Sequence, residues 1–122
     1  MNIGNYICGP QLVGVLIYLA GMLMQKFPPK KINGFYGYRT LSSMKNQQIW
    51  EVANRYSAKV MARRGILCFI ISIAVTILLN YLVADERKIE RFMAATTICS
   101  VILLAVLVLI LTERHLQKTF KK

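Results

Sequence analysis

The sequence predicts an all-α membrane protein with three transmembrane helices and one cytoplasmic amphipathic helix at the membrane interface. The main observation is that three apolar runs carry no charged residue, namely 7–24, 65–84 and 92–112. A helix of about 20 residues is roughly 30 Å long, which matches the hydrocarbon thickness of a bilayer. In addition, 56% of the 122 residues are hydrophobic, and most of them fall in these runs. Because few remain for a water-soluble core, we expect a single membrane domain over residues 1–122.

The first transmembrane helix is expected over residues 8–25. Its less apolar residues recur at spacings of 3, 4, 3 and 4, which places them on one helix face. These seam residues are Gln11, Gly14, Tyr18, Gly21 and Gln25. Glycine lets a second backbone approach closely, and Gln or Tyr can hydrogen-bond across an apolar contact. The seam therefore predicts a helix-packing interface, either within the chain or between copies in a homo-oligomer. A polar groove that admits a ligand is the other interpretation.

The segment 26–64 is expected to be cytoplasmic and to contain the amphipathic helix. Pro28 and Pro29 should end the first helix, because proline lacks an amide hydrogen and restrains the residue before it. Helical spacing then predicts a helix over 43–63 that lies in the plane of the membrane interface. On residue type alone, Trp50 is interpreted as an interfacial anchor. The apolar stripe of this helix consists of Ile49, Val52, Ala53, Tyr56 and Val60.

The second and third transmembrane helices are expected over 65–84 and 92–112. A short outer loop, 85–91, should join them, either as a tight connection or as an extension of the flanking helices. The tail, 113–122, should be cytoplasmic. No Asp, Glu, Lys, Arg or His lies deep in any of the apolar runs. Charges inside a membrane usually mark proton or ion pathways, so the sequence argues against an ion-coupled transporter.

The charges between the apolar runs predict the orientation. Segment 26–64 holds nine Lys and Arg residues against one acid, whereas 85–91 holds three bases and three acids. Because Lys and Arg are retained on the cytoplasmic side, we expect the N-terminus outside and the C-terminus in the cytoplasm. The net charge of +11 is then explained by this rule and by anionic lipid headgroups at the inner face. No nucleic-acid-binding motif is present, so nucleic acid is not expected as a partner.

Neither a metal nor a cofactor nor a catalytic site is expected. The three cysteines, Cys8, Cys68 and Cys99, are far apart, and His115 is the one histidine of the chain. This spacing does not match a metal site. Acid–base or nucleophilic catalysis needs a poised pair of groups. On the inner side the acidic side chains are Glu51 and Glu113, which do not form a sequence pair, and the sequence has no GxSxG or HExxH motif. We therefore expect a protein that is not an enzyme.

The segment after the first run carries an ordered motif pattern. It consists of PPKKIN at 28–33, YGYRT at 36–40, SMKN at 43–46 and WxxAN at 50–54. This pattern resembles the SdpI family of small bacterial membrane proteins over roughly 28–65. The resemblance implies a set of signature residues, which become the candidate residues for binding a ligand or partner. They are Gly37, Tyr38, Arg39, Thr40, Trp50 and Asn54.

The resemblance also implies a function. The family's named example is an immunity protein, which protects a toxin-producing cell from its own membrane-active toxin and holds a repressor at the membrane. We therefore expect toxin resistance by binding or sequestration, with a peptide toxin or a repressor protein as partner. That protein is longer and has more spans, which weighs against functions that need the extra spans, repressor capture among them. A lipid- or peptide-binding membrane protein and a small oligomeric transporter component are the alternatives.

Overall fold

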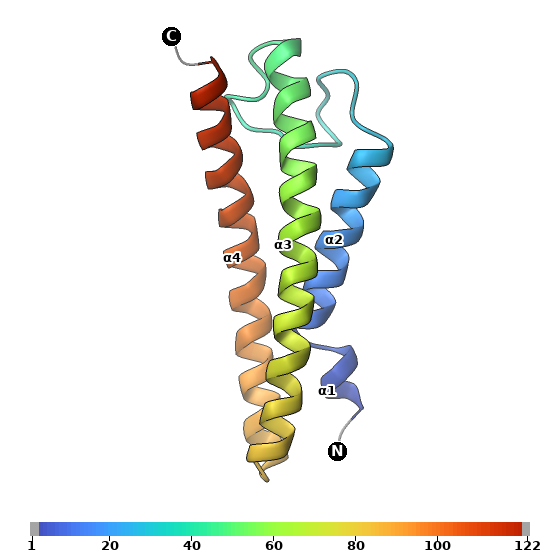
Figure 1. The fold of residues 1–122 in the computed structure, drawn as a ribbon, viewed down its shortest axis with the longest axis vertical. Coiled ribbons are helices and arrows are strands. Elements are labelled where there is room, and N and C mark those ends of the chain that lie inside the picture. Colours follow the sequence, from blue (N-terminus) through green and yellow to red (C-terminus); the bar gives the residue numbers. More distant parts are fainter. Residues whose placement is uncertain (1–2, 121–122) are drawn as a thin grey trace.

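The computed structural model describes residues 3–120, and this part of the chain is helical without strands (Figure 1). A short helix, α1 (Gly4–Ile7), precedes three longer ones, α2 (Pro10–Lys26), α3 (Gln47–Leu82) and α4 (Glu86–Phe120). Helices α3 and α4 form an antiparallel pair, and α2 packs against the middle of α3. Both α3 and α4 are long and apolar enough to cross a membrane.

The region expected as the first span is interrupted near its start. Helix α2 begins at Pro10, because proline is tolerated in the first turn, where its missing amide hydrogen would have no helical partner. Cys8 and Gly9 before it are extended, so the chain changes direction between α1 and α2. Figure 1 shows α1 continuing from α2 toward the end of the bundle where α3 meets α4. With 17 residues, α2 is about 25 Å long.

Helix α3 joins two elements that the sequence predicted as separate. The helix expected over 43–63 begins at Gln47 and continues without a break to Leu82. Asn46 forms its N-cap, since its side-chain oxygen accepts a hydrogen bond from the Ile49 amide at 2.9 Å. No proline lies between 47 and 82, so nothing in the sequence ends the helix at the membrane surface. Within residues 3–120 the prediction of a separate interfacial helix is therefore wrong.

The apolar stripe of this first half of α3 contacts protein. Ala53 is fully buried in a cluster with Tyr38 from the loop and Leu116 from α4. Ile49, Val52, Val108 and Phe120 pack around this cluster. The expected tail supplies part of the cover, because α4 extends past residue 112 to Phe120. The stripe is thus occupied and does not face a membrane surface.

The connection between α3 and α4 is short. Helix α3 ends at Leu82 and α4 begins at Glu86, so most of the expected outer loop, 85–91, is helical. Asp85 precedes the first turn of α4, and its carboxylate accepts a hydrogen bond from the Arg87 amide at 3.0 Å. Of the two possibilities for this segment, the structure has the extension of a flanking helix.

Glycines bring α2 and α3 into backbone contact. A Cβ atom added to Gly14 would lie 2.6 Å from the backbone nitrogen of Phe69. A Cβ atom added to Gly65 would lie 2.5 Å from the backbone nitrogen of Tyr18, and Gly21 makes a similar contact farther along α2. No real side chain fits at such distances, and small residues at helix interfaces permit this close approach. The position of α2, and hence the start of the loop that follows it, is fixed by these glycines.

Candidate functional site

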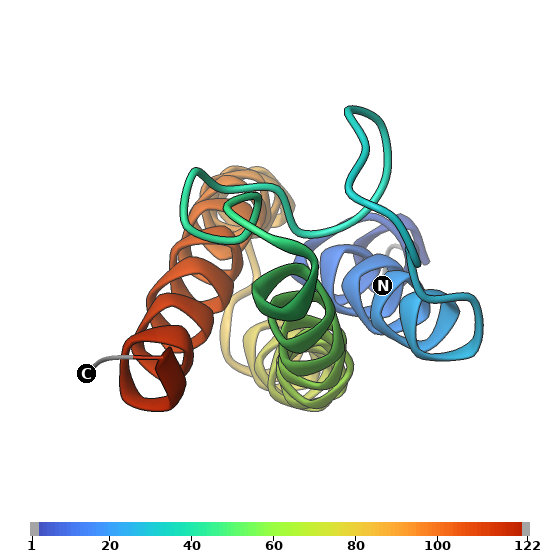
Figure 2. The same cartoon turned by 90° about the horizontal axis from the view of Figure 1, so that it is seen from above.

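The candidate site is the loop of residues 27–46 together with the parts of α3 and α4 that hold it. We call residues 27–46 the anchored loop. Figure 2 shows it leaving α2, passing across the end of the bundle and reaching α4 before it enters α3. Most of the signature residues lie in this loop or in the first two turns of α3. The loop therefore brings signature residues that are far apart in the sequence close together in the fold.

Asn54 fastens the loop backbone to α3. Its side chain is 3% exposed, and its Oδ1 accepts a hydrogen bond from the Tyr38 amide. Its Nδ2 donates to the Trp50 carbonyl at 2.9 Å and to the Tyr38 carbonyl at 3.4 Å. Both backbone groups of Tyr38 thus pair with one side chain. A buried amide needs such partners, and here they fix the course of the loop.

Gly37 makes this pairing sterically feasible. Its φ angle is +108°, a conformation that side-chain-bearing residues rarely adopt. A Cβ atom at this position would also collide with the Asn54 side-chain oxygen and with the Pro29 ring. Gly37 therefore allows the chain to turn toward Asn54 at the closest point of approach.

Trp50 fixes the beginning of the loop. Its side chain is 0% exposed, and its Nε1–H donates a hydrogen bond to the Pro29 carbonyl at 2.7 Å. The interpretation of Trp50 as an interfacial membrane anchor is therefore wrong, because the ring is enclosed by protein. A buried indole with a satisfied N–H holds the loop at the residue where the first helix has just ended.

Tyr38 and Thr40 connect the loop to α4. The Tyr38 hydroxyl donates to Glu113 Oε1 at 2.7 Å, and the Thr40 hydroxyl donates to the same oxygen at 2.8 Å. Burial, together with the neighbouring Glu113 carboxylate, raises the pKa of Tyr38, so the phenol stays protonated and keeps its role as donor. Glu113 was missed by the sequence reasoning. Its position directly after the third apolar run was the signal that it would lie at the same end of the bundle as the loop.

Ser43 closes the second half of the loop. It is fully buried, and its hydroxyl donates to the Tyr38 carbonyl at 3.0 Å. Ser43 Oγ also accepts a hydrogen bond from the Thr40 amide at 2.8 Å. Ser43 belongs to the SMKN part of the motif pattern. Its bonds hold residues 38–43 as a compact turn against α4.

Arg39 differs from the other signature residues because it is exposed. Its guanidinium donates to the Gly34 carbonyl and takes no part in the buried network. Two apolar side chains of the anchored loop are also nearly fully exposed, Phe35 at 95% and Leu41 at 93%. The signature therefore divides into buried or half-buried residues that fix the loop and one exposed cation.

The seam residues of the first helix lie against α3. Gly14 and Gly21 make the backbone contacts described above, and Gln11 is buried. Gln25 donates from Nε2 to the Ala58 carbonyl at 3.4 Å. Tyr18 is half-buried beside Gly65. In this structure the face that the seam defines is occupied by a helix of the same chain.

Within residues 3–120, no three His, Cys, Asp or Glu side chains are placed to hold a metal ion. His115 stacks on the Tyr56 ring, with 4.0 Å between the ring centroids and parallel planes. This stack joins α3 to α4 close to the anchored loop. In this position the histidine contributes to helix packing.

Comparisons with known proteins agree with the motif pattern. The model of the SdpI/YfhL protein family matches residues 30–112, which include most of the anchored loop, α3 and most of α4. A Bacillus subtilis (strain 168) protein described as "Uncharacterized protein YfhL" is 52% identical over 54 residues. The match covers 44% of this chain and 49% of that protein, about half the length of the relative. No solved structure shows significant similarity.

Proposed function

Because the chain belongs to the SdpI/YfhL protein family, we propose that it gives a bacterial cell immunity to a membrane-active peptide toxin by binding or sequestering the toxin. The observation that carries this proposal is the anchored loop, which holds Arg39 and Phe35 exposed on a backbone fixed to two helices. In this mechanism the protein holds the toxin non-covalently, and no covalent bond is made or broken. The one carboxylate bound to the loop, Glu113, already accepts two hydrogen bonds.

The fixed conformation of the anchored loop favours partner binding. A segment that is already ordered loses little conformational freedom when a partner binds, so more of the contact energy appears as affinity. Arginine can bind a carboxylate through parallel N–H groups, and a neighbouring aromatic ring offers apolar contact. A membrane-active peptide presents both an apolar surface and a terminal carboxylate. The exposed side chains of the anchored loop are complementary to both features.

The proposed setting is a bacterial inner membrane with the anchored loop in the cytoplasm. We propose three spans, namely α3, α4 and the interrupted segment of α1 and α2, with the N-terminus outside. Large apolar side chains that are exposed on α3 and α4 support insertion, since lipid can cover them. They include Ile70, Ile77, Leu78, Ile98, Ile102 and Leu103. The excess of Lys and Arg in 26–64 supports the orientation.

We also propose partners other than a toxin. Anionic headgroups would surround the basic end of the bundle. A repressor protein could bind the cytoplasmic loop and thereby report the toxin, and copies of the chain could associate through their lipid-facing helices. Each of these proposals places the partner at or near the anchored loop, or along α3 and α4.

The proposal is tested by survival of toxin-sensitive cells that express the chain. We expect wild type to protect, and we expect Arg39→Ala to lose protection by about tenfold or more, since a charged hydrogen bond contributes about 1.5–3 kcal/mol. Lys31→Ala is the matched control, because Lys31 is an exposed cation of the same loop. Membrane levels of each variant are measured in parallel. Equal killing of cells with and without the wild-type protein rejects immunity to that toxin.

A further inference from the structure

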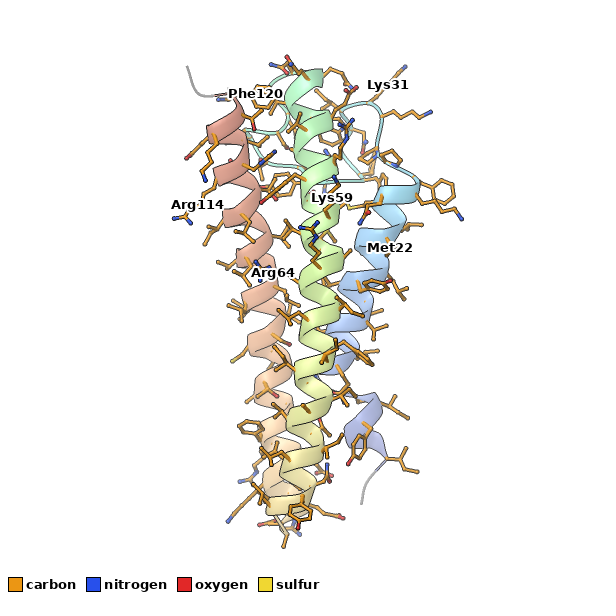
Figure 3. The ribbon with its side chains drawn as sticks, in the orientation of Figure 1. Met22, Lys31, Lys59, Arg64, Arg114 and Phe120 are labelled. Atoms are coloured by element: carbon orange, nitrogen blue, oxygen red, sulfur yellow. The ribbon has the colours of Figure 1, made fainter. Side chains whose placement is uncertain are left out.

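A groove of about 410 Å³ follows the outer surface of α3 and α4. It lies apart from the anchored loop, within the apolar half of α3 and the facing part of α4. Arg64 lies at the end nearer the loop, as Figure 3 shows. The remaining lining is mainly aliphatic and includes Leu67, Ile71, Val75, Leu103 and Leu107.

The polar side chains in this groove have their hydrogen bonds within the protein. The Thr96 hydroxyl donates to the Phe92 carbonyl at 2.9 Å, and the Ser100 hydroxyl donates to the Thr97 carbonyl at 2.8 Å. Such bonds to the preceding turn are common for Ser and Thr in membrane helices. With these donors already used, the groove offers a polar solute little compensation for its lost hydration. A hydrocarbon chain fits this chemistry better.

The end of the groove nearer the anchored loop is lined by cations whose charge no nearby carboxylate neutralises. Lys59, Arg63 and Arg64 line an adjoining pocket of about 510 Å³, beside Tyr56. Within residues 3–120 none of these three cations has a carboxylate partner. The acids at this end are engaged elsewhere, since Glu113 accepts bonds from the loop and Glu51 accepts one from Gln47. An anion is therefore the complementary occupant of this pocket.

The length of the apolar stretch matches one lipid leaflet. Arg64, Leu67, Ile71 and Val75 follow helical spacing along one face of α3. From Arg64 to Val75 the helix rises about 16 Å, which is close to half of the roughly 30 Å hydrocarbon core. An acyl chain that starts at the cationic pocket would thus end near the middle of the bilayer.

We propose that the groove and its cationic end bind one anionic glycerophospholipid from the leaflet nearest the anchored loop. The phosphate contacts Lys59, Arg63 and Arg64, and one acyl chain lies in the groove between α3 and α4. This inference rests on the proposed membrane insertion of α3 and α4. It does not depend on toxin binding.

The experiment is native mass spectrometry of the full chain in detergent with added phosphatidylglycerol or phosphatidylcholine. We expect one phosphatidylglycerol molecule to bind in preference to phosphatidylcholine. Because each basic residue near the surface contributes about 1 kcal/mol, Arg64→Gln should weaken binding about fivefold. Lys31→Gln is the matched control, because Lys31 is an exposed cation of the anchored loop that lines neither the groove nor the adjoining pocket. Arg64→Lys should keep most of the binding.

A second variant tests the position of the acyl chain. Ser100→Phe places a large ring in the groove and keeps every cation, so phosphatidylglycerol binding should fall at least fivefold. Ile98→Phe adds size at an exposed position outside the groove and should bind as wild type does. Equal binding of the two lipids, or unchanged binding by both Arg64→Gln and Ser100→Phe, overturns the proposal. Loss of toxin protection with lipid binding intact would reject the proposed immunity alone.

Discussion

Asn54 and Gly37 show how few residues determine the course of the 20-residue anchored loop. Asn54 supplies hydrogen bonds to both backbone groups of Tyr38, and Gly37 removes the Cβ atom that would block that approach. Trp50 and Glu113 then hold the loop at two further points. A partner that binds Arg39 or Phe35 therefore meets a preformed surface. Most of the signature residues therefore hold the anchored loop in place.

Replacing Asn54 should loosen the loop and leave the helices intact. Asn54→Leu removes the acceptor of the Tyr38 amide, and an unsatisfied buried donor costs about 1–3 kcal/mol. We expect a lower unfolding midpoint in detergent and faster hydrogen exchange of the Tyr38 amide. Asn80→Leu is the matched control, because the Asn80 side chain bonds only the Thr76 carbonyl of its own helix. Unchanged exchange at Tyr38 in Asn54→Leu would contradict the assigned role.

Two glycines of the anchored loop should differ in their tolerance of alanine. Gly37→Ala places a Cβ atom against Asn54 and Pro29 at a positive φ, so we expect a destabilisation of about 1–3 kcal/mol. A Cβ atom at Gly34 would meet nothing within 4 Å, so Gly34→Ala should be neutral within about 0.5 kcal/mol. Thermal unfolding of the two variants under identical conditions makes the comparison. Equal stability of both would show that Gly37 is not strained in the way we describe.

Sequence patterns singled out several of the residues that hold the anchored loop, but not their structural roles. The motif pattern includes Trp50, Asn54 and Gly37, and all three are structural contacts in the folded chain. Residue type alone could not tell a buried tryptophan from an interfacial one, since both environments suit an indole ring. Glu113 lies 73 residues beyond Thr40, and a contact over that separation follows only from the antiparallel course of α4.

At the scale of elements, the continuity of α3 is the main departure from the sequence prediction. The stripe from Ile49 to Val60 has the same helical spacing whether its cover is lipid or protein. Periodicity identifies the buried face and says nothing about what buries it. The cover is the end of α4, whose residues 113–120 are too polar to be recognised as a packing surface. By contrast, two of the apolar runs lie largely within α3 and α4, which are long and apolar enough to cross a membrane.

The glycine contact between α2 and α3 should not tolerate added volume. Gly65→Val would force its side chain into the backbone at Tyr18, so we expect α2 to separate from α3 and stability to fall by about 1–3 kcal/mol or more. Ala74→Val adds volume at an exposed position of α3 and should be nearly neutral. Thermal unfolding in detergent measures both. A Gly65→Val protein as stable as wild type would contradict the close packing of these two helices.

At the scale of the whole molecule, the two ends of the bundle differ. At one end, α3 and α4 are joined by a three-residue turn, Val83 to Asp85. At the other, both helices extend beyond their apolar runs and hold the anchored loop. The extensions and the loop together contain most of the basic residues. The molecule therefore has one end that is little more than a turn and one that is a small packed unit. The binding function proposed above would involve the second end.

The orientation of these two ends can be measured directly. Cys8, Cys68 and Cys99 are first replaced by alanine, and a single cysteine is then introduced at Lys31 in the anchored loop or at Lys88 in the first turn of α4. Because basic segments stay on the cytoplasmic side, a membrane-impermeant maleimide added to intact cells should label Lys88→Cys. It should label Lys31→Cys only after the cells are permeabilised. Both positions are exposed, so burial does not limit either reaction. Labelling of Lys31→Cys in intact cells would place the loop outside, and a cytoplasmic repressor could then not reach it.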